Sequence, residues 1–373
     1  MFERRNAHHQ KLARSLLKIS QTPVPGRLSN RRRTMIEIDG SCGEGGGQIL
    51  RSSLSLSALT GREMRVTNIR AKRRKPGLMR QHLTCVKAVA EISGGSTCGA
   101  EISSQELVFS PGKLRAGDYR FAVGSAGSAV LIAQTVLPLL LHAEAASRVV
   151  IEGGTHAANA PVFDYFERVY LPCLRRMGAE VTAVLDRVGF YPAGGGKIEL
   201  SVIPVREWKP LVIDETGVPK AARLVSISHG IDAKIRDDEL AFCLAALDRP
   251  DGFETESREV DSPGPGNVMF AELEFEHVTE LFSVCGDFDL SRKAVGERVA
   301  GMVNRYRALS APVWRFLADQ LLLPMAIGAG GAYLTCPPGR HTQTNIEVIR
   351  KFLEIGITVE NRQNGQYRIE VKQ

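Results

Sequence analysis

The sequence predicts an α/β protein of repeated units, in which a short β-strand, a loop of small polar residues and an amphipathic helix follow one another. Three observations predict this fold class: the unit recurs, its helices end at glycine, and the composition is that of a globular protein. Hydrophobic residues make up 43% of the 373 residues and charged residues 24%, with 36 glycines. Because this length exceeds one ordinary core, we expect at least two folding units.

Residues 1–34 differ from the rest of the chain. They are rich in arginine and almost free of acidic residues. This composition fits a targeting peptide, but a wrongly assigned start codon is the preferred interpretation, because Met35 directly precedes the first convincing strand, Ile36–Asp39. We therefore expect a disordered or mis-started extension outside the folded core.

Four copies of the unit can be placed from residue 36 onward. Their strand, loop and helix fall at 36–38, 40–47 and 48–61; at 119–123, 124–127 and the segment after it; at 149–151, 153–160 and 161–178; and at 333–334, 337–344 and 345–356. In the third copy Pro161 suits a first helical turn and Gly178 a C-terminal cap. A single such loop does no more than join a strand to a helix. Several helix N-termini together would favour a phosphate-rich pocket.

The texture of the sequence changes over residues 208–307. A strand at 224–228, a helix at 238–247 and an alternating strand at 270–275 predict a small α/β domain there. We expect it to be inserted into a main domain, whose first part is 35–207 and whose final repeat is 308–373.

The charge balance favours an anionic partner. The formal net charge is +7 and the isoelectric point is near 9.1. Much of this charge falls in a run of basic residues from Arg70 to Arg80, interrupted by Pro76 and Gly77, which predicts a loop leading into a helix. The alternative is an ordinary solvated turn.

The seven cysteines form no C-x-x-C pair, and their number is odd. This favours reduced thiols in the cytoplasm over a disulfide framework or a structural zinc site. The most apolar stretch, Leu131–Leu141, contains Gln134 and Pro138 and is too short to cross a bilayer, so we expect no membrane span.

No Walker A motif occurs, and residues 43–48 lack the spacing of a dinucleotide fingerprint. In the first loop, Glu44 precedes Gln48 and Arg51, which lie three apart at the helix start and so share a face. A carboxylate beside an arginine and open amides suits a divalent metal with a phosphate, although a helix-end salt bridge is the alternative. His341 falls in a loop just ahead of a helix, where it is either a bystander or a nucleophile for nucleotide transfer.

Five stretches together resemble the RNA 3′-terminal phosphate cyclase family. They appear in family order and span nearly everything from Met35 onward: Gly43–Arg51, Lys75–His82, Phe190–Gly196, Gly264–Asn267 and Leu317–Gln320. The resemblance implies repeated units of a β-sheet backed by two helices, similar to the enolpyruvyl transferases, with a small inserted α/β domain.

The resemblance also implies a ligase-class reaction that uses ATP, a divalent metal (Mg or Mn) and an RNA with a 3′-phosphate. A histidine takes AMP from ATP and releases pyrophosphate, AMP passes to the RNA 3′-phosphate, and the 2′-hydroxyl closes a 2′,3′-cyclic phosphate. No oligomeric state is implied. By correspondence with the family, His341 carries AMP, Arg51 assists catalysis and Glu44 binds the metal. The implied ATP-binding residues are Gln48, Gln134, Pro161, Phe316, Leu317, Ala318, Asp319 and Gln320, and the implied RNA-phosphate residues are Arg70, Arg73 and Gln81.

One departure from the family is Phe316, which stands where some relatives have tyrosine. Stacking on a purine survives this change, whereas a phenol hydrogen bond is lost. Two alternatives remain: a non-catalytic, cyclase-like protein that binds RNA or assists ribosome assembly, and an enolpyruvyl-type transferase. Relatives of the first kind lack the nucleophilic histidine, which this chain has. A transferase of the second kind gives no reason for a histidine-linked nucleotide.

Overall fold

The computed structural model describes residues 35–309 and 311–373, so the predictions for residues 1–34 lie outside the described part. Within it, three four-stranded sheets share one topology, βαβαββ. In each sheet the first two strands are parallel and the last two are joined antiparallel. The predicted α/β fold of repeated sheet-and-helix units is confirmed.

The first repeat has the strand order β1-β2-β4-β3 and the second β5-β6-β8-β7. The elements of the first are β1 (Ile36–Asp39), α2 (Gly47–Thr60), β2 (Met64–Thr67), α3 (Arg80–Ser93), β3 (Ser96–Cys98) and β4 (Leu107–Ser110). Those of the second are β5 (Asp118–Ala122), α4 (Ala129–Leu140), β6 (Ser147–Gly153), α5 (Phe163–Tyr165), a π-helical turn (Phe166–Tyr170), α6 (Leu171–Arg176), β7 (Glu180–Arg187) and β8 (Gly196–Ile203).

The third repeat is interrupted after its first strand. Its elements are β9 (Leu211–Ile213), α9 (Arg315–Ile327), β14 (Gly331–Thr335), α10 (Arg340–Phe352), β15 (Gly356–Asn361), a 3-10 turn (Gln363–Gly365) and β16 (Tyr367–Lys372), with the sheet order β9-β14-β16-β15. Between β9 and α9 the chain forms a further sheet, β11-β10-β12-β13, with two helices. The residue boundaries predicted for an inserted domain, 208 and 307, stay a prediction.

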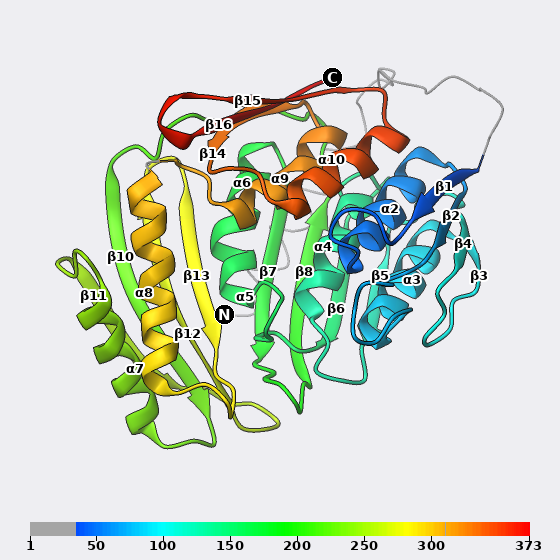
Figure 1. Cartoon of the computed structure of the whole chain (residues 1–373). Coiled ribbons are helices and arrows are strands. Elements are labelled where there is room, and N and C mark those ends of the chain that lie inside the picture. Colours follow the sequence, from blue (N-terminus) through cyan, green and yellow to red (C-terminus); the bar gives the residue numbers. More distant parts are fainter. Residues whose placement is uncertain (1–34, 310) are drawn as a thin grey trace, which may run out of the picture. The chain divides into compact units, whose positions relative to one another are not determined.

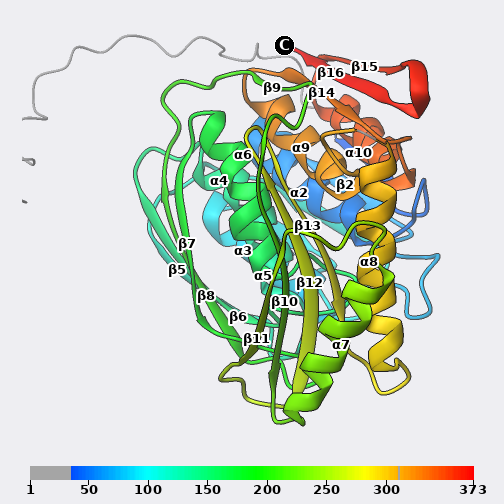
Figure 2. The same cartoon turned by 90° about the vertical axis from the view of Figure 1, so that its left-hand side faces the viewer.

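The interrupting segment comprises β10 (Pro219–His229), α7 (Ala233–Ala246), β11 (Phe253–Glu259), β12 (Gly266–Phe275), β13 (Thr279–Cys285) and α8 (Arg292–Leu309); we call residues 214–314 the insertion. Figure 1 shows α7 and α8 side by side along its sheet. Strand β13 contacts the π-helical turn of the second repeat. Figures 1 and 2 show β13 beside α5 and α6, the helices that flank this turn. The insertion therefore lies against the helices of the second repeat.

Helix α2 contacts α3, α4 and α10, which explains its unusual sequence. Its serines are buried together with its leucines, because small side chains let neighbouring helices approach closely. Ser52 Oγ donates to Asn345 Oδ1 of α10 at 2.8 Å, and Ser55 Oγ donates to the carbonyl of Thr135 in α4 at 2.8 Å. These bonds satisfy the buried hydroxyls and join the three repeats at one helix.

Three helix starts differ from the prediction. Helix α10 begins at Arg340 rather than Asn345, which places His341 in its first turn and not in a loop. The polar residues that suggested a loop, Thr344 and Asn345, are buried and bonded to α2 and to the loop before it. Pro161 precedes its helix by two residues, and α7 begins at Ala233, where the side chain of its cap, Asp232, accepts from Lys234 N at 2.9 Å.

The predictions from cysteine usage and hydropathy can be compared with the structure. All seven cysteines are free thiols in the structure. Over residues 35–309 and 311–373 no helix combines the length and apolar character that crossing a membrane requires.

A buried carboxyl, Glu280 on β13, lies where the insertion meets α9. It is fully inaccessible to solvent, and burial raises its pKa to about 8. An acid with a raised pKa in the folded state favours the folded state only while protonated. The contribution of Glu280 to the free energy of unfolding is therefore complete below the pKa of the unfolded state, near 4.5. It is lost as the pH rises to about 8.

We expect Glu280→Gln to remove this pH dependence. Between pH 5 and pH 8 the free energy of unfolding of the wild type should fall, relative to the variant, by on the order of 4 kcal/mol. Urea unfolding at several pH values measures it. The exposed Glu297→Gln serves as control and should follow the wild type; equal slopes for wild type and Glu280→Gln would contradict the prediction.

Candidate active site

A cavity of about 740 Å³ opens where the N-terminal parts of α2, α9 and α10 meet α4 and the loop before α5. Nine of the predicted residues line it: Gln48, Arg51, Arg73, Gln134, Pro161, Phe316, Asp319, Gln320 and His341. They come from segments up to 293 residues apart, as in the pair Gln48 and His341. Residues from the first turns of three helices, α2, α9 and α10, thus line one cavity.

His341 stands in the first turn of α10 with its side chain 58% exposed. Its Nδ1 lies 2.6 Å from Gln48 Oε1, and its Nε2 lies 3.9 Å from Glu44 Oε2. A carbonyl oxygen only accepts hydrogen bonds, so Nδ1 carries the proton in this pair. The neutral ring then has its lone pair on Nε2.

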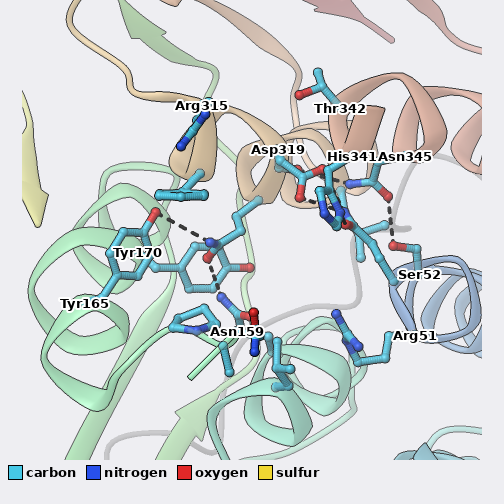
Figure 3. Close-up of a pocket in the computed structure, with 18 of the residues that line it drawn as sticks. Arg51, Ser52, Asn159, Tyr165, Tyr170, Arg315, Asp319, His341, Thr342 and Asn345 are labelled. Carbon is cyan, nitrogen blue, oxygen red and sulfur yellow. Dashed lines mark hydrogen bonds between the residues drawn. The ribbon is translucent and has the colours of Figure 1, made fainter. Parts of the chain in front are cut away.

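The orientation of the Gln48 amide is set by Asp319 of α9. Gln48 Nε2 donates to both carboxylate oxygens at 2.7 Å, which turns its carbonyl oxygen toward His341. Burial raises the pKa of Asp319, while the bond from Gln48 and the nearby His341 oppose that rise. Asp319, Gln48 and His341 thus form a relay that selects the histidine tautomer. Figure 3 shows Asp319 and His341 on the same side of the cavity.

Glu44 lies beside this relay in the glycine loop ahead of α2. Its side chain is only 6% exposed, its Oε2 forms an ion pair with Arg73, and its amide donates to Thr344 Oγ1 at 3.2 Å. Gly43 permits this approach, because it has φ +52° and a Cβ there would lie 1.9 Å from Thr344 Oγ1.

The second carboxylate oxygen of Glu44, Oε1, is buried and has no hydrogen-bond partner among the described residues. Such an atom fits a cation, whose coordination would be completed by phosphate oxygens and water. In residues 35–309 and 311–373 no three histidine, cysteine or acidic residues group closely enough to hold a metal by themselves. A metal at Glu44 would therefore depend on a bound phosphate.

Arg51, one turn into α2, is the cation of the polar end. No carboxylate within the described residues forms an ion pair or hydrogen bond with it, and burial lowers its pKa. Gly47 leaves room for it, since a Cβ there would lie 2.8 Å from its guanidinium and 2.4 Å from His82 Nε2. Burial and the charges of Arg51 and Arg70 lower the pKa of His82 to about 3, so this histidine is neutral.

The other end of the cavity is largely apolar. Tyr165 and Tyr170 form the side opposite His341, as Figure 3 shows, and Phe316 and Pro161 also line it. The Phe316 side chain is 44% exposed and Arg315 lies over its ring, 5.0 Å from the centroid. A flat aromatic ligand fits between such surfaces.

Two glutamines supply hydrogen-bonding groups at this end. Gln134 Nε2 donates to Gln320 Oε1, and Gln320 Nε2 donates to the hydroxyl of Tyr165 at 3.5 Å. The carbonyl oxygen of Gln134 takes no part in these two bonds, so the pair can reorganise around a ligand with both donors and acceptors.

Five predicted residues do not line the cavity. Glu44 lies just outside it, beside Arg73 and His341. Leu317 and Ala318 lie on the buried face of α9 itself. Arg70 donates to the carbonyls of Lys75 and Gly77, at 2.7 and 2.9 Å, and so holds the basic loop. Gln81 Oε1 accepts from Ser128 N at 2.6 Å, where α4 begins.

Several lining residues were not predicted. Asn345 accepts from Ser52 and donates to the carbonyl of Asp319 at 3.0 Å, which ties α2, α9 and α10 together behind His341. A Thr-Asn pair shortly after His341 was the available signal. Leu281 and Ser283 of the insertion also line the cavity. The alternation of apolar residues along a strand gave no indication of their place in the cavity, because alternation does not identify which other element a strand face contacts.

The fold defines an α/β protein built from sheet-and-helix repeats. A histidine, a carboxylate and a guanidinium without an ion-pair partner among the described residues lie where the starts of several helices meet. The cavity there suits an anionic ligand. The profile of the RNA 3′-terminal phosphate cyclase family matches residues 42–359. The chain belongs to this family, as its motifs predicted.

Curated relatives extend over nearly the same length. The chain is 44% identical to an RNA 3′-terminal phosphate cyclase of Koribacter versatilis (strain Ellin345), over 91% of this chain and 95% of the relative. It is 45% identical to one of Pseudomonas fluorescens, over 87% and 94%, and 43% identical to one of Ectopseudomonas mendocina, over 91% and 99%.

Among solved structures, the enolpyruvyl transferase NikO from Streptomyces tendae is similar with a TM-score of 0.38 and 11% identity. The similarity covers 89% of this chain and 47% of that chain, which is about half of its length.

Proposed function

We propose that this chain uses ATP to convert an RNA 3′-terminal phosphate to a 2′,3′-cyclic phosphate, with His341 carrying AMP as a covalent intermediate. Family membership supports the overall reaction. The observation that carries the covalent step is the relay from Asp319 through Gln48, which gives His341 a lone pair on Nε2 at the polar end of the cavity.

In the first step His341 Nε2 attacks the α-phosphorus of ATP. The Nε2–phosphorus bond forms, the bond from phosphorus to the bridging oxygen breaks, and pyrophosphate leaves. The Nδ1 proton stays bonded to Gln48 Oε1 and stabilises the positive charge that develops on the ring. Arg51 would offset charge on the phosphates, because no carboxylate among the described residues forms a direct ion pair with it, although Glu44 and Asp319 lie near enough to interact with its charge.

In the second step an oxygen of the RNA 3′-phosphate attacks the same phosphorus, the nitrogen–phosphorus bond breaks and the histidine is regenerated. The 2′-hydroxyl then attacks the activated 3′-phosphorus, loses its proton to solvent and expels AMP. This closure is intramolecular, so proximity supplies much of its rate. Arg73 would hold the RNA phosphate at the cavity, and Arg70 and Gln81 would do so through the loop and helix starts that they fix.

The apolar end of the cavity is assigned to adenine, between Phe316 and Pro161, with Gln134 and Gln320 at its edge. Glu44 would hold a divalent metal, Mg or Mn, whose charge offsets that of the phosphates when it is bound. We also propose a cytoplasmic location, which seven free thiols support.

The proposal is tested by incubating the wild type with Mg²⁺ and ATP labelled at the α-phosphate, followed by denaturation. We expect one label per chain, released by acid and retained in alkali, as for a phosphoramidate, and located by mass spectrometry in the peptide that contains His341. RNA with a 3′-phosphate should discharge it and yield a 2′,3′-cyclic end. A wild type that takes up no label would overturn the proposal.

Asp319→Asn should slow adenylylation by roughly 10- to 100-fold. Asparagine can donate as well as accept, so the Gln48 amide is no longer held in one orientation and His341 populates the tautomer that lacks a lone pair on Nε2. Single-turnover labelling at saturating ATP measures the loss. Asp186→Asn on β7, where the carboxylate pairs with Lys197 and does not line the cavity, is the comparison variant. An unchanged rate in Asp319→Asn would contradict the relay.

RNA binding should depend strongly on salt and weakly on sequence, because the basic loop at 70–80 offers guanidinium groups but no platform that reads bases. If three phosphates are contacted, the logarithm of the binding constant should fall with the logarithm of salt with a slope of about −2. Fluorescence anisotropy with two unrelated oligonucleotides measures it. Arg74→Ala should flatten the slope, whereas Arg305→Ala on α8 should not; binding that ignores salt would exclude this assignment.

A further inference from the structure

The insertion contributes one wall of the cavity. Leu281 and Ser283 of β13 line it. Because successive strand residues point to opposite faces, Glu280 and Phe282 point the other way. On that face Phe282 packs edge-on against the ring of Trp314, with 6.1 Å between ring centroids. Strand β13 thus contacts the cavity on one side and the start of α9 on the other.

Glu280 makes the polar contact of this joint. Its Oε1 accepts the backbone N–H of Trp314 at 2.7 Å, and Trp314 is the residue that caps α9. In a capping box, a glutamate within the helix itself bonds the N–H of the cap. Here the carboxyl comes from the insertion, 34 residues earlier in the chain. The first turn of α9 is therefore anchored to a different sheet.

Within residues 35–309 and 311–373, no cation forms an ion pair with Glu280. The titratable groups facing it are Tyr165 of the second repeat, Tyr306 of α8 and Cys173 of α6. Its Oε2 and the Trp314 indole N–H are both buried without a partner among the described residues. The contact to the Trp314 amide is thus the one bond that the carboxyl makes, and burial keeps the group protonated at neutral pH.

The anchor fixes the start of α9, and this helix carries several residues that line the cavity. Its first two residues, Arg315 and Phe316, line the apolar end of the cavity, and its second turn carries Asp319 and Gln320. Phe316 has no hydrogen bond of its own, so its place depends on the backbone of that turn. A shift of the turn moves the aromatic wall more than the polar end, because Asp319 is also held by Gln48 and Asn345.

We propose that Glu280 is a positioning residue for the nucleotide cavity: through the Trp314 amide it fixes the start of α9, and it thereby sets the affinity for the adenosine part of ATP without touching it. This rests on the proposed function. The insertion is then a part of the nucleotide site, since its sheet holds the wall against which the base lies.

The test measures binding of α,β-methylene-ATP with Mg²⁺ by calorimetry, because this analogue cannot transfer AMP. Glu280→Ala should raise the dissociation constant about tenfold, the usual effect of one lost buried hydrogen bond. Glu280→Gln keeps an oxygen that accepts the Trp314 N–H and should stay within about twofold of the wild type. Adenylylation should follow the same division, with KM for ATP raised and kcat nearly unchanged.

Glu239→Ala is the matched control. Glu239 is a buried carboxyl of the same insertion, and the residues bonded to it, Ser226 and Asn267, lie on β10 and β12 rather than on α9. It should lower the melting temperature as Glu280→Ala does, yet leave nucleotide affinity unchanged. If Glu280→Ala is not recovered folded, Glu280→Asp, which withdraws the acceptor by one methylene, replaces it in the comparison with Glu280→Gln.

Each outcome decides the proposal. Weakened binding in Glu280→Ala or Glu280→Asp, restored in Glu280→Gln and absent in Glu239→Ala, supports it. Equal affinity in all variants, or equal loss in both alanine variants, overturns it. A wild type that binds the analogue but takes up no label from ATP would refute the covalent mechanism alone, so the two failures are distinguishable.

Discussion

Replacing His341 by asparagine should abolish covalent labelling by ATP, with a loss of at least about 10⁴-fold in the rate of adenylylation. Asparagine can still donate to Gln48 Oε1, so the relay to Asp319 keeps its partner, but no nitrogen lone pair remains to attack phosphorus. Affinity for α,β-methylene-ATP should change by less than about threefold, since the adenine end of the cavity is untouched. Labelling and calorimetry on the same preparation separate the two effects.

The control for this variant is His229→Asn. His229 lies on β10 of the insertion, and its Nδ1 is 2.8 Å from the carbonyl of Val260. It has the same chemistry but no place in the cavity, so its labelling should equal that of the wild type. If label persists on His341→Asn, the nucleophile lies elsewhere. Label that resists acid is not a phosphoramidate, whether of histidine or of lysine, and would also refute the assignment.

The repeats could be predicted from sequence because each carries local signals. The strands alternate or run apolar, the loops are rich in glycine, and glycine ends the helices, as at Gly61 and Gly178, where φ is +66° and +99°. These features act within one strand, loop and helix, a unit of roughly 25 to 30 residues. Gln48 and Arg51, which the sequence placed on one helix face, both line the cavity, because they belong to one helix turn.

What could not be predicted depends on contacts between units. The relay joins Gln48 to Asp319 across 271 residues, and no local pattern pairs them. The start of α10 was set too late because its first turn is polar, and only the contacts of Thr344 and Asn345 with the first repeat explain why a polar turn is buried. That the insertion lines the cavity was not predicted for the same reason, since nothing in the sequence distinguishes Leu281 and Ser283 from other strand residues.

The second large effect is expected for Arg51→Ala, which should lower the adenylylation rate by about 10²- to 10³-fold. The guanidinium lies beside Gly47 at the polar end of the cavity, and no carboxylate among the described residues pairs with it. His82 next to it is neutral, because its pKa is lowered to about 3. In the proposed mechanism Arg51 would therefore be the fixed charge that opposes the negative charge on the departing pyrophosphate.

Arg51→Lys separates charge from geometry. Lysine restores a positive charge but not the planar fork that can bond two phosphate oxygens, so we expect it to recover part of the loss, leaving a defect of about tenfold. Single-turnover labelling at saturating ATP is the measurement, and Arg62→Ala is the control. Arg62 follows the same helix and donates to the carbonyl of Lys351 at 3.1 Å, away from the cavity. If Arg51→Ala labelled as fast as Arg62→Ala, the charge balance of the transfer would have to come from another group, and the exposed Arg340 of α10 would be the next to replace.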